Sequence, residues 1–244
     1  MIGSLFYHFG RKVAPGVRKA KWLWGSMTAT DSELVQLEHD VGVDLACQAR
    51  QQIQLDADPD VAEAVNGVGA RLAERVANKH RSFRFEVFAA KAPNAFALPG
   101  GFVFVSRPIV LLCEGNCDEL AFVLGHEMGH IISGHAIERI VTHSAVSVAS
   151  RAAPVSGPLA GWLRRVGVQF LETAYSRDHE LEADRLGVRL SAAAGYDPEA
   201  SMRLLGRLAE MKDASPANDP GEYFSTHPTF DLRIRSIRQF LSRR

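Results

Sequence analysis

The chain has 244 residues, which is enough for one domain with a substantial hydrophobic core. Its 28 basic and 28 acidic side chains balance to a formal net charge of zero, which argues against a general nucleic-acid binder. The three cysteines include no CxxC pair, so they predict no disulfide framework and mildly favour a reducing compartment. No stretch approaches the ~20 uninterrupted apolar residues that a transmembrane helix needs.

The first thirty residues differ in composition from the rest of the chain. They contain no acidic side chain and interleave basic residues with aromatic ones. This composition suits contact with a membrane surface, and it also fits an organellar transit peptide or a strap packed on the main domain. Arg11 and Lys12 interrupt the apolar run, so no secretory signal peptide is expected. We therefore expect an N-terminal segment (1–30), a main domain (31–244) and a cytoplasmic or peripherally membrane-associated protein.

The first part of the main domain shows helical periodicity and then strand-like alternation. Apolar spacing predicts two helices, and the alternating stretches that follow predict a strand and a hairpin with a Pro-Gly-Gly turn. The predicted bounds are about 31–53 and 59–78 for the helices, 83–88 for the strand and 94–105 for the hairpin. We therefore expect a small sheet directly before the next helix.

The motif HEMGH at 126–130 carries the most chemical information in the chain. Because helix positions four apart point the same way, His126 and His130 can bind one metal ion. Glu127 lies beside them, where a carboxylate can accept a proton from a water molecule at the metal. This is the HExxH arrangement of zinc peptidases. The alternative is an ordinary core helix with two histidines and a salt-bridged glutamate.

The motif is expected to lie in a long buried helix, because apolar helix formers precede it and continue after it. Asn116 or Asp118 would cap this helix. The later stretch at 143–168 is ambiguous and could be a flap, a membrane-facing element or a loop over the active site. Further helices are predicted at about 170–194, from Asp197 onward and at the basic C-terminus, with a polar loop at 213–221.

A catalytic zinc site usually has three protein ligands, so a third ligand is expected outside the motif. His135 lies five positions beyond His130, about 140° away on an ideal helix, and is more readily a packed polar residue or a partner of a ligand. Glu180 and Asp184 share one helix face, which favours Glu180 as the ligand and leaves Asp184 to bond the distal nitrogen of a ligating histidine. Glu182 points about 200° away from Glu180, towards solvent.

Three motifs together resemble peptidase family M48, a family of zinc metallopeptidases. They are HEMGH, the stretch YSRDHELEAD at 175–184 and the pair His227-Pro228. The resemblance covers residues 60 to 240 and is greatest to the mitochondrial overlapping-activity proteases and their bacterial relatives. It implies a zincin-like (gluzincin) fold of the α+β class, mainly helical, with a small antiparallel-edged sheet packed on the HExxH helix. Transmembrane helices found in many relatives are not predicted here.

The resemblance also assigns the metal site. It implies one zinc ion per chain, held by His126, His130 and Glu180, with Glu127 as the general base. Asp184 matches the aspartate of the family's ExxxD motif.

The same resemblance implies residues that act on the substrate. His227 stands in the family's HPxxxxR pattern, which Arg233 completes, and would stabilise the tetrahedral oxyanion. The stretch Asn94-Ala95-Phe96 resembles the edge strand on which these enzymes hold an extended peptide. Asn94, Ala95, Phe96 and Arg233 are therefore the candidate substrate-binding residues.

These features predict a zinc-dependent metalloendopeptidase that hydrolyses internal peptide bonds of protein substrates. Membrane-associated or misfolded proteins in quality control are the expected substrates. One rival is a catalytically silent, metal-stabilised binding module at a membrane surface, and the intact Glu127 argues against it. A second rival is a zinc hydrolase that acts on small esters or amides rather than proteins.

Overall fold

The structure is a computed structural model that describes residues 31–139, 174–214, 227 and 230–243. The predictions for the N-terminal segment, for 143–168 and for most of the polar loop at 213–221 fall outside these residues. Among the helices that the structure describes, none is both long and apolar enough to span a membrane.

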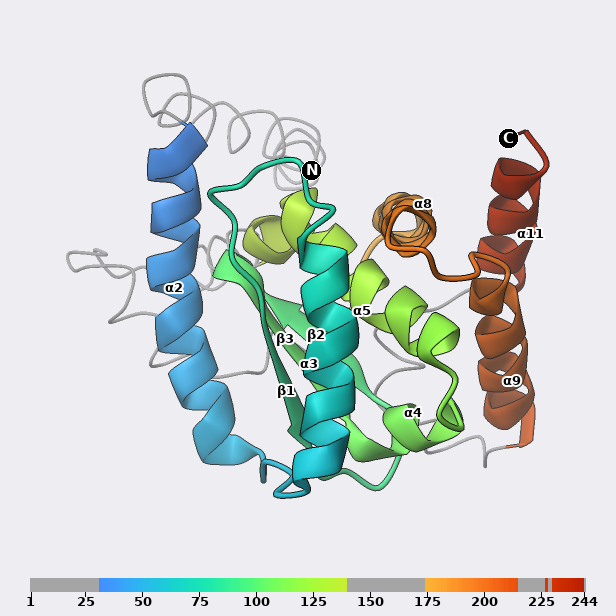
Figure 1. Ribbon diagram of the computed structural model, residues 1–244, viewed down its shortest axis with the longest axis horizontal. Helices are drawn as coiled ribbons and strands as arrows, with labels where there is room; N and C mark the ends of the chain where they lie inside the picture. Colours follow the sequence, from blue (N-terminus) through green and yellow to red (C-terminus); the bar gives the residue numbers. More distant parts are fainter. Residues whose placement is uncertain (1–30, 140–173, 215–226, 228–229, 244) are drawn as a thin grey trace, which may run out of the picture.

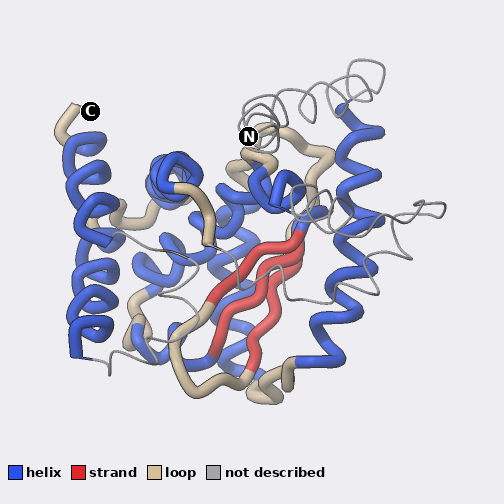
Figure 2. Tube along the Cα trace, turned by 180° about the vertical axis from the view of Figure 1, so that it is seen from behind, coloured by secondary structure: helices blue, strands red, loops and turns tan. Residues whose placement is uncertain are grey.

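Mainly helical elements surround one small sheet, as predicted (Figures 1 and 2). Helix α2 (Asp31–Gln52) keeps its predicted bounds, and α3 (Pro59–Ala73) begins at the predicted proline. Asp58 caps α3 by accepting hydrogen bonds from two backbone amides of its first turn. Helix α3 ends before the predicted Asn78, because its last residues form tight three-residue turns. Lys79 Nζ then donates to a carbonyl at the helix end.

The sheet has three strands, β1 (Arg84–Phe88), β2 (Ala95–Leu98) and β3 (Phe102–Ser106), in the order β1-β3-β2. Strand β3 pairs parallel with β1 and antiparallel with β2, so the predicted hairpin is confirmed. The short turn η1 (Pro99–Gly101) joins β2 to β3. Both of its glycines have positive φ, 73° and 98°, a region that other residues enter only at a cost.

Both faces of the sheet are covered by helices, so the strands are buried almost throughout. Alternate side chains point to opposite faces of a strand. On one face, the apolar side of α2 packs against Phe96, Leu98, Phe102 and Phe104. On the other face, α3 and α5 (Cys117–Ile132) pack against Ala95, Ala97, Val103 and Val105. The sheet is therefore a middle layer between α2 on one face and α3 and α5 on the other (Figure 1).

The motif helix α5 runs through the core, as predicted. Its N-cap is Asn116, the first of the two predicted caps, whose side chain accepts from the backbone amides two and three residues on. Every side chain from Glu119 to Ile131 is buried. The short helix α4 (Arg107–Leu112), between β3 and α5, was not predicted.

Residues 135–139 are also helical, and α8 (Arg177–Ala193), α9 (Ala200–Ala214) and α11 (Phe230–Leu241) follow later in the chain. Helix α8 begins later than predicted, because residues 174–176 are not helical and Ser176 caps the helix. Helix α9 also begins later, after a turn in which Asp197 accepts from the backbone of Glu199. Helix α8 packs on α5, and α11 packs on both α8 and α9 (Figure 1).

Glycines let α5 and α8 meet with their backbones in contact. A Cβ built on Gly187 would lie 2.8 Å from the amide nitrogen of His126 and 3.0 Å from the carbonyl carbon of Gly125. A Cβ on Gly129 would lie 2.9 Å from the carbonyl oxygen of Ala183. The small residues are spaced four apart on each helix, so the contact extends over one turn. This approach brings the carboxylates of α8 to the histidines of α5.

We expect Gly187→Ala to lower the free energy of unfolding by about 1–3 kcal/mol, the usual cost of over-packing a filled interior. The new methyl group would meet backbone atoms, which cannot rotate away. Urea denaturation measures the change. The control is Gly67→Ala in α3, where a Cβ has nothing within 4 Å, and it should leave stability unchanged or raise it by up to about 1 kcal/mol. Equal stability of the two variants would show that the helices tolerate a wider spacing.

Candidate metal centre

Four side chains meet in one buried cluster: His126, His130, Glu180 and His227. One potential ligand atom from each lies within 4.8 Å of the other three. Helix α5 supplies the first two, α8 supplies the glutamate, and His227 comes from the chain shortly before α11. All four are at most 1% exposed, so the cluster is closed off from bulk water.

Both histidines of the motif turn the same ring nitrogen towards the cluster. The Nε2 atoms of His126 and His130 are 3.1 Å apart, as the four-residue helical spacing allows. Glu180 Oε1 lies 3.3 Å from Nε2 of His130, and Glu180 Oε2 lies 3.7 Å from Nε2 of His126. One carboxylate therefore reaches both imidazoles, and the three side chains can share one ion.

His227 reaches both the metal-binding atoms and the predicted base. Its Nδ1 lies 3.3 Å from Nε2 of His126 and 3.0 Å from Oε1 of Glu180. Its Nε2 lies 3.7 Å from Oε1 of Glu127. This position suits a donor to a reacting oxygen, and it also suits a fourth ligand.

Glu127 is completely buried beside this cluster. Within the described part of the chain, neither of its carboxylate oxygens accepts a hydrogen bond. Buried carboxylates are normally hydrogen-bonded, because leaving them without partners is costly. These two orphaned oxygens fit a centre that holds a cation and a water molecule next to the base.

Asp184 and Arg233 support the cluster from behind. Asp184 Oδ1 lies 2.9 Å from Nδ1 of His126, the distal nitrogen of that ring. Arg233, from α11, donates to both oxygens of Asp184 at 2.9 and 2.7 Å, and its Nη1 lies 3.0 Å from Oε2 of Glu180. The arginine was expected to bind substrate, but its side chain is 0% exposed. The structure instead places Arg233 against the two carboxylates of α8.

The charges in this interior shift several pKa values. Burial alone would raise the pKa of Glu180, but His227 and Arg233 outweigh it and hold that pKa well below its usual range. Against the same effect of burial, Arg233 keeps the pKa of Asp184 low. Burial lowers the pKa of His130 far below its ordinary value. Burial also acts to lower the pKa of His227, but Glu180 reverses this and the pKa is raised. The carboxylates are thus held charged and His130 neutral, the states that bind a cation.

The two side chains that the sequence disfavours as ligands lie outside the cluster. His135 Nδ1 is 3.1 Å from Nδ1 of His130, the nitrogen on the far side of that ring from the cluster. Burial and the neighbouring His179 lower the pKa of His135 to about 4, so this ring is neutral. The side chain of Glu182 is 62% exposed, as its helical angle predicts.

Tyr175 is a contact of the centre that the sequence did not assign. Its ring stacks on His130 with centroids 3.7 Å apart and planes 17° from parallel. The guanidinium of Arg139 lies 4.1 Å from the centre of the same tyrosine ring. Only the place of Tyr175 shortly before Glu180, in the YSR stretch, could have pointed to it.

The predicted substrate-binding stretch lies at an edge of the sheet. Within the described residues, β2 pairs with β3 on one side and with no strand on the other. Asn94, Ala95 and Phe96 are at most 9% exposed, so their side chains pack inside the domain. Asn94 also exchanges two hydrogen bonds with Ser106 of β3 through its backbone. Each of these residues is buried as a whole, main chain included.

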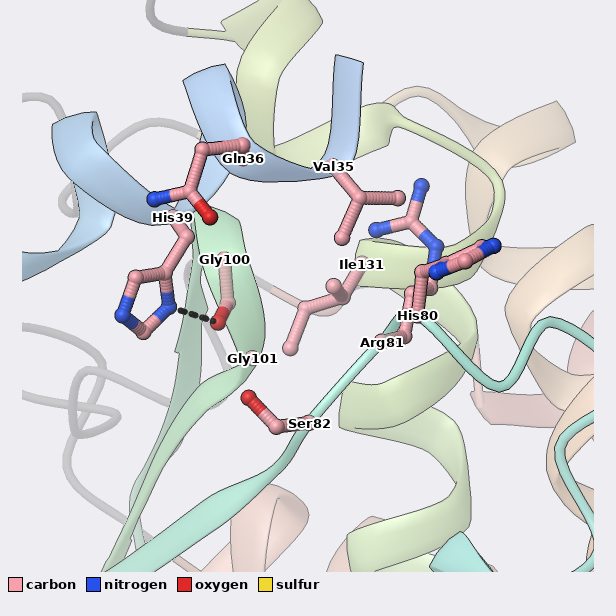
Figure 3. Close-up of a pocket in the computed structure, with 9 residues that line it drawn as sticks. All are labelled: Val35, Gln36, His39, His80, Arg81, Ser82, Gly100, Gly101 and Ile131. Carbon is pink, nitrogen blue, oxygen red and sulfur yellow. Dashed lines mark hydrogen bonds between the residues drawn. The ribbon is translucent and has the colours of Figure 1, made fainter. Parts of the chain in front are cut away.

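A cavity of about 160 Å³ lies apart from the cluster, at the turn between β2 and β3 (Figure 3). Figure 3 shows the ring of His39, from α2, directed at the carbonyl oxygen of Gly100, with Nδ1 and that oxygen 3.2 Å apart. The walls of the cavity come from α2, residues 80–82 and the turn between β2 and β3, and Ile131 of α5 closes one side. No residue of the cluster lines it, so this cavity is not part of the candidate metal centre.

The chemistry of the cluster fits a zinc ion. Its donors are three imidazole nitrogens and one carboxylate oxygen, a set that Zn²⁺ commonly takes. The distal nitrogens of His126 and His130 each lie within 3.1 Å of a polar atom, as those of ligating histidines usually do. The orphaned oxygens of Glu127 complete this fit.

Known proteins are similar to a large part of this chain. Mitochondrial metalloendopeptidase OMA1 of Schizosaccharomyces pombe is 37% identical over 163 residues, which are 65% of this chain and 47% of that protein. The beta-barrel assembly-enhancing protease of Yersinia pestis is 29% identical over 205 residues, 78% of this chain and 41% of that protein. The corresponding protease of Escherichia coli K12 is 28% identical over 209 residues. The chain thus spans less than half the length of the curated relatives it matches.

A family model also matches the chain. The model described as "Peptidase family M48" aligns with residues 59–241, which include every side chain of the cluster. This match covers well over half of the sequence and agrees with the resemblance of the three motifs. The chain therefore belongs to peptidase family M48.

Proposed function

We propose that the chain is a zinc-dependent metalloendopeptidase that hydrolyses internal peptide bonds of protein substrates. The observation that carries this proposal is the position of Glu127. Its buried carboxylate, without hydrogen bonds among the described residues, lies beside four side chains able to hold a metal ion. A structural zinc site needs four closed ligands and no adjacent base, whereas a catalytic site needs both a base and room for water. Membership of a peptidase family supports the same reading.

Each side chain has a role that follows from its position. His126, His130 and Glu180 would hold the ion, as in a gluzincin centre; bound zinc supplies Lewis acidity and lowers the pKa of a water molecule towards about 7. Glu127 would accept a proton from that water and pass it to the leaving amine. His227, whose Nε2 faces Glu127, would donate a hydrogen bond to the oxyanion that forms on the peptide carbonyl.

We propose polypeptides as the partners of this centre, including membrane-associated or misfolded proteins in quality control. The names of the relatives support this class, since they describe mitochondrial metalloendopeptidases and beta-barrel assembly-enhancing proteases. An extended peptide would have to uncover β2, which pairs with no second strand among the described residues, before pairing with its backbone. Such pairing favours unfolded segments, because a folded substrate has no free strand to offer.

We expect Glu127→Gln to keep its zinc and to lose about 10²–10⁴-fold in kcat on casein, because the amide cannot accept the proton. Zinc content is measured by atomic absorption on the same preparation. Phenanthroline added to the wild type should abolish cleavage by removing the metal. Normal casein cleavage by the variant would contradict the assigned base.

Substitutions of the cluster should separate ligands from a catalytic donor. Glu180→Ala should lose zinc, because it removes the carboxylate that reaches both ligand imidazoles. His227→Ala should keep zinc and lose about 10²–10³-fold in kcat, the usual effect of removing an oxyanion donor. Asp178→Ala is the matched control, since it removes an exposed carboxylate of α8 two residues from Glu180. Loss of zinc from His227→Ala would make His227 a ligand instead.

We propose that the catalytic domain comprises residues 31–244 and that residues 1–30 contact membrane surfaces. The interleaved aromatic and basic residues of that segment support the proposal. Flotation with liposomes that contain anionic lipid should then carry the full chain, and a chain that begins at Asp31 should remain at the bottom. Equal flotation of the two chains would remove the segment from consideration.

A further inference from the structure

The two histidines of the HExxH motif have different partners on their distal nitrogens. Nδ1 of His126 lies 2.9 Å from a carboxylate oxygen of Asp184. Nδ1 of His130 lies 3.1 Å from Nδ1 of another imidazole, that of His135. A carboxylate can only accept a hydrogen bond, whereas a neutral imidazole accepts at one nitrogen and donates at the other. The second contact therefore depends on which nitrogen of each ring carries the hydrogen.

The position of His130 determines which nitrogen carries the hydrogen in its own ring and in that of His135. Its Nε2 faces the cluster, 3.1 Å from Nε2 of His126, and must offer a lone pair to bind a metal ion. The hydrogen of the neutral ring is then on Nδ1, which donates to Nδ1 of His135. His135 accepts there, so its own hydrogen is on Nε2, and that nitrogen faces Oε2 of Glu182 at 3.5 Å.

We propose that His135 is a positioning residue that holds His130 in the orientation and tautomer required for metal binding. This inference rests on the proposed metallopeptidase function and goes beyond it. Neither the HExxH pattern nor the set of candidate ligands requires a residue at this place. His135 would act through His130 and would touch neither the metal nor the substrate.

A break in the helix brings His135 to this place. On a continued helix its side chain would point about 140° away from that of His130. Helix α5 ends at Ile132, and Gly134 follows with φ of 77°, a left-handed conformation that glycine adopts without strain. The chain therefore turns back, and the ring of His135 lies edge-on to that of His130 with centroids 5.2 Å apart.

The surroundings of His135 keep its ring in one place. The residue is 3% exposed. Its ring stacks on that of His179 with centroids 4.1 Å apart and planes 16° from parallel. Tyr175 stacks in the same way on His130. Both imidazoles are thus held by aromatic neighbours, and the nitrogen-to-nitrogen contact is kept from water, which would compete for the hydrogen bond.

To test the role of His135, asparagine and glutamine are placed at this position, because their side-chain amides put an acceptor at different places. In His135→Asn the side-chain oxygen can occupy the position of Nδ1, and in His135→Gln the amide reaches only the position of Nε2. The full chain, loaded with zinc, is titrated with a chromogenic chelator to obtain the zinc dissociation constant. We expect His135→Gln and His135→Leu to bind zinc about 10–100-fold more weakly than the wild type, as for other partners of ligating histidines, and His135→Asn to bind it nearly as well.

If His135 served only to stabilise the fold, the zinc affinities of the variants would follow their thermal stabilities. The thermal midpoint of each metal-free variant is measured beside its zinc affinity, and Asn and Gln should lower it alike, because both replace the buried ring. The visible spectrum of the Co²⁺-substituted chains should match the wild type for Asn and differ for Gln. Equal zinc affinity of the Asn and Gln variants would overturn the inference and leave the proposed function intact. A wild-type chain that binds no zinc would overturn both.

Discussion

The candidate centre depends on the contact between α5 and α8, where no side chain separates the two backbones. At Gly125 and Gly187 the helices are close enough that an added methyl group would lie within 3.1 Å of backbone atoms. Main-chain atoms pack without rotamer freedom, so this contact fixes the distance between the helices more firmly than larger side chains could. Glu180 and Asp184 occupy the same face of α8 one turn apart, and the short spacing delivers both to the histidine motif. The ligand distances are therefore a property of the helix pair rather than of flexible side chains.

The same short spacing between α5 and α8 buries carboxylates where water cannot solvate them. Helix α11 offsets their negative charge with a guanidinium group. Arg233 is buried, donates to both oxygens of Asp184 and lies within ion-pair distance of Glu180. Its planar guanidinium suits this arrangement, because its five donors can serve two carboxylates at once. A lysine would offer one charge without that geometry. Helix α11 is thus connected to the metal site through one side chain, although it contributes no ligand.

Local patterns in the sequence predicted most of the elements and the ligand candidates, because they depend on spacing within one element. The hairpin with its Pro-Gly-Gly turn, the Asn116 cap and the shared face of Glu180 and Asp184 are of this kind. Features that depend on contacts between distant segments were missed or misplaced. Arg233 was expected at the substrate and is buried behind the ligands. His135 was expected as a packed residue or a partner of a ligand, and the structure places it against the distal nitrogen of His130; the ideal helix angle alone does not show this, because α5 ends before Gly134.

The balance of charge around the candidate metal centre favours the binding of a cation. Among the described residues, the carboxylates of Glu127, Glu180 and Asp184 are buried here, with the guanidinium of Arg233 and the imidazole of His227 as basic neighbours. Unpaired charge in an interior costs several kcal/mol per group unless a partner offsets it. The raised pKa of His227 reflects the same excess of negative charge, since Glu180 is what raises it. A cation at the cluster would offset part of this negative charge. We therefore expect metal binding and folding to be coupled in this chain.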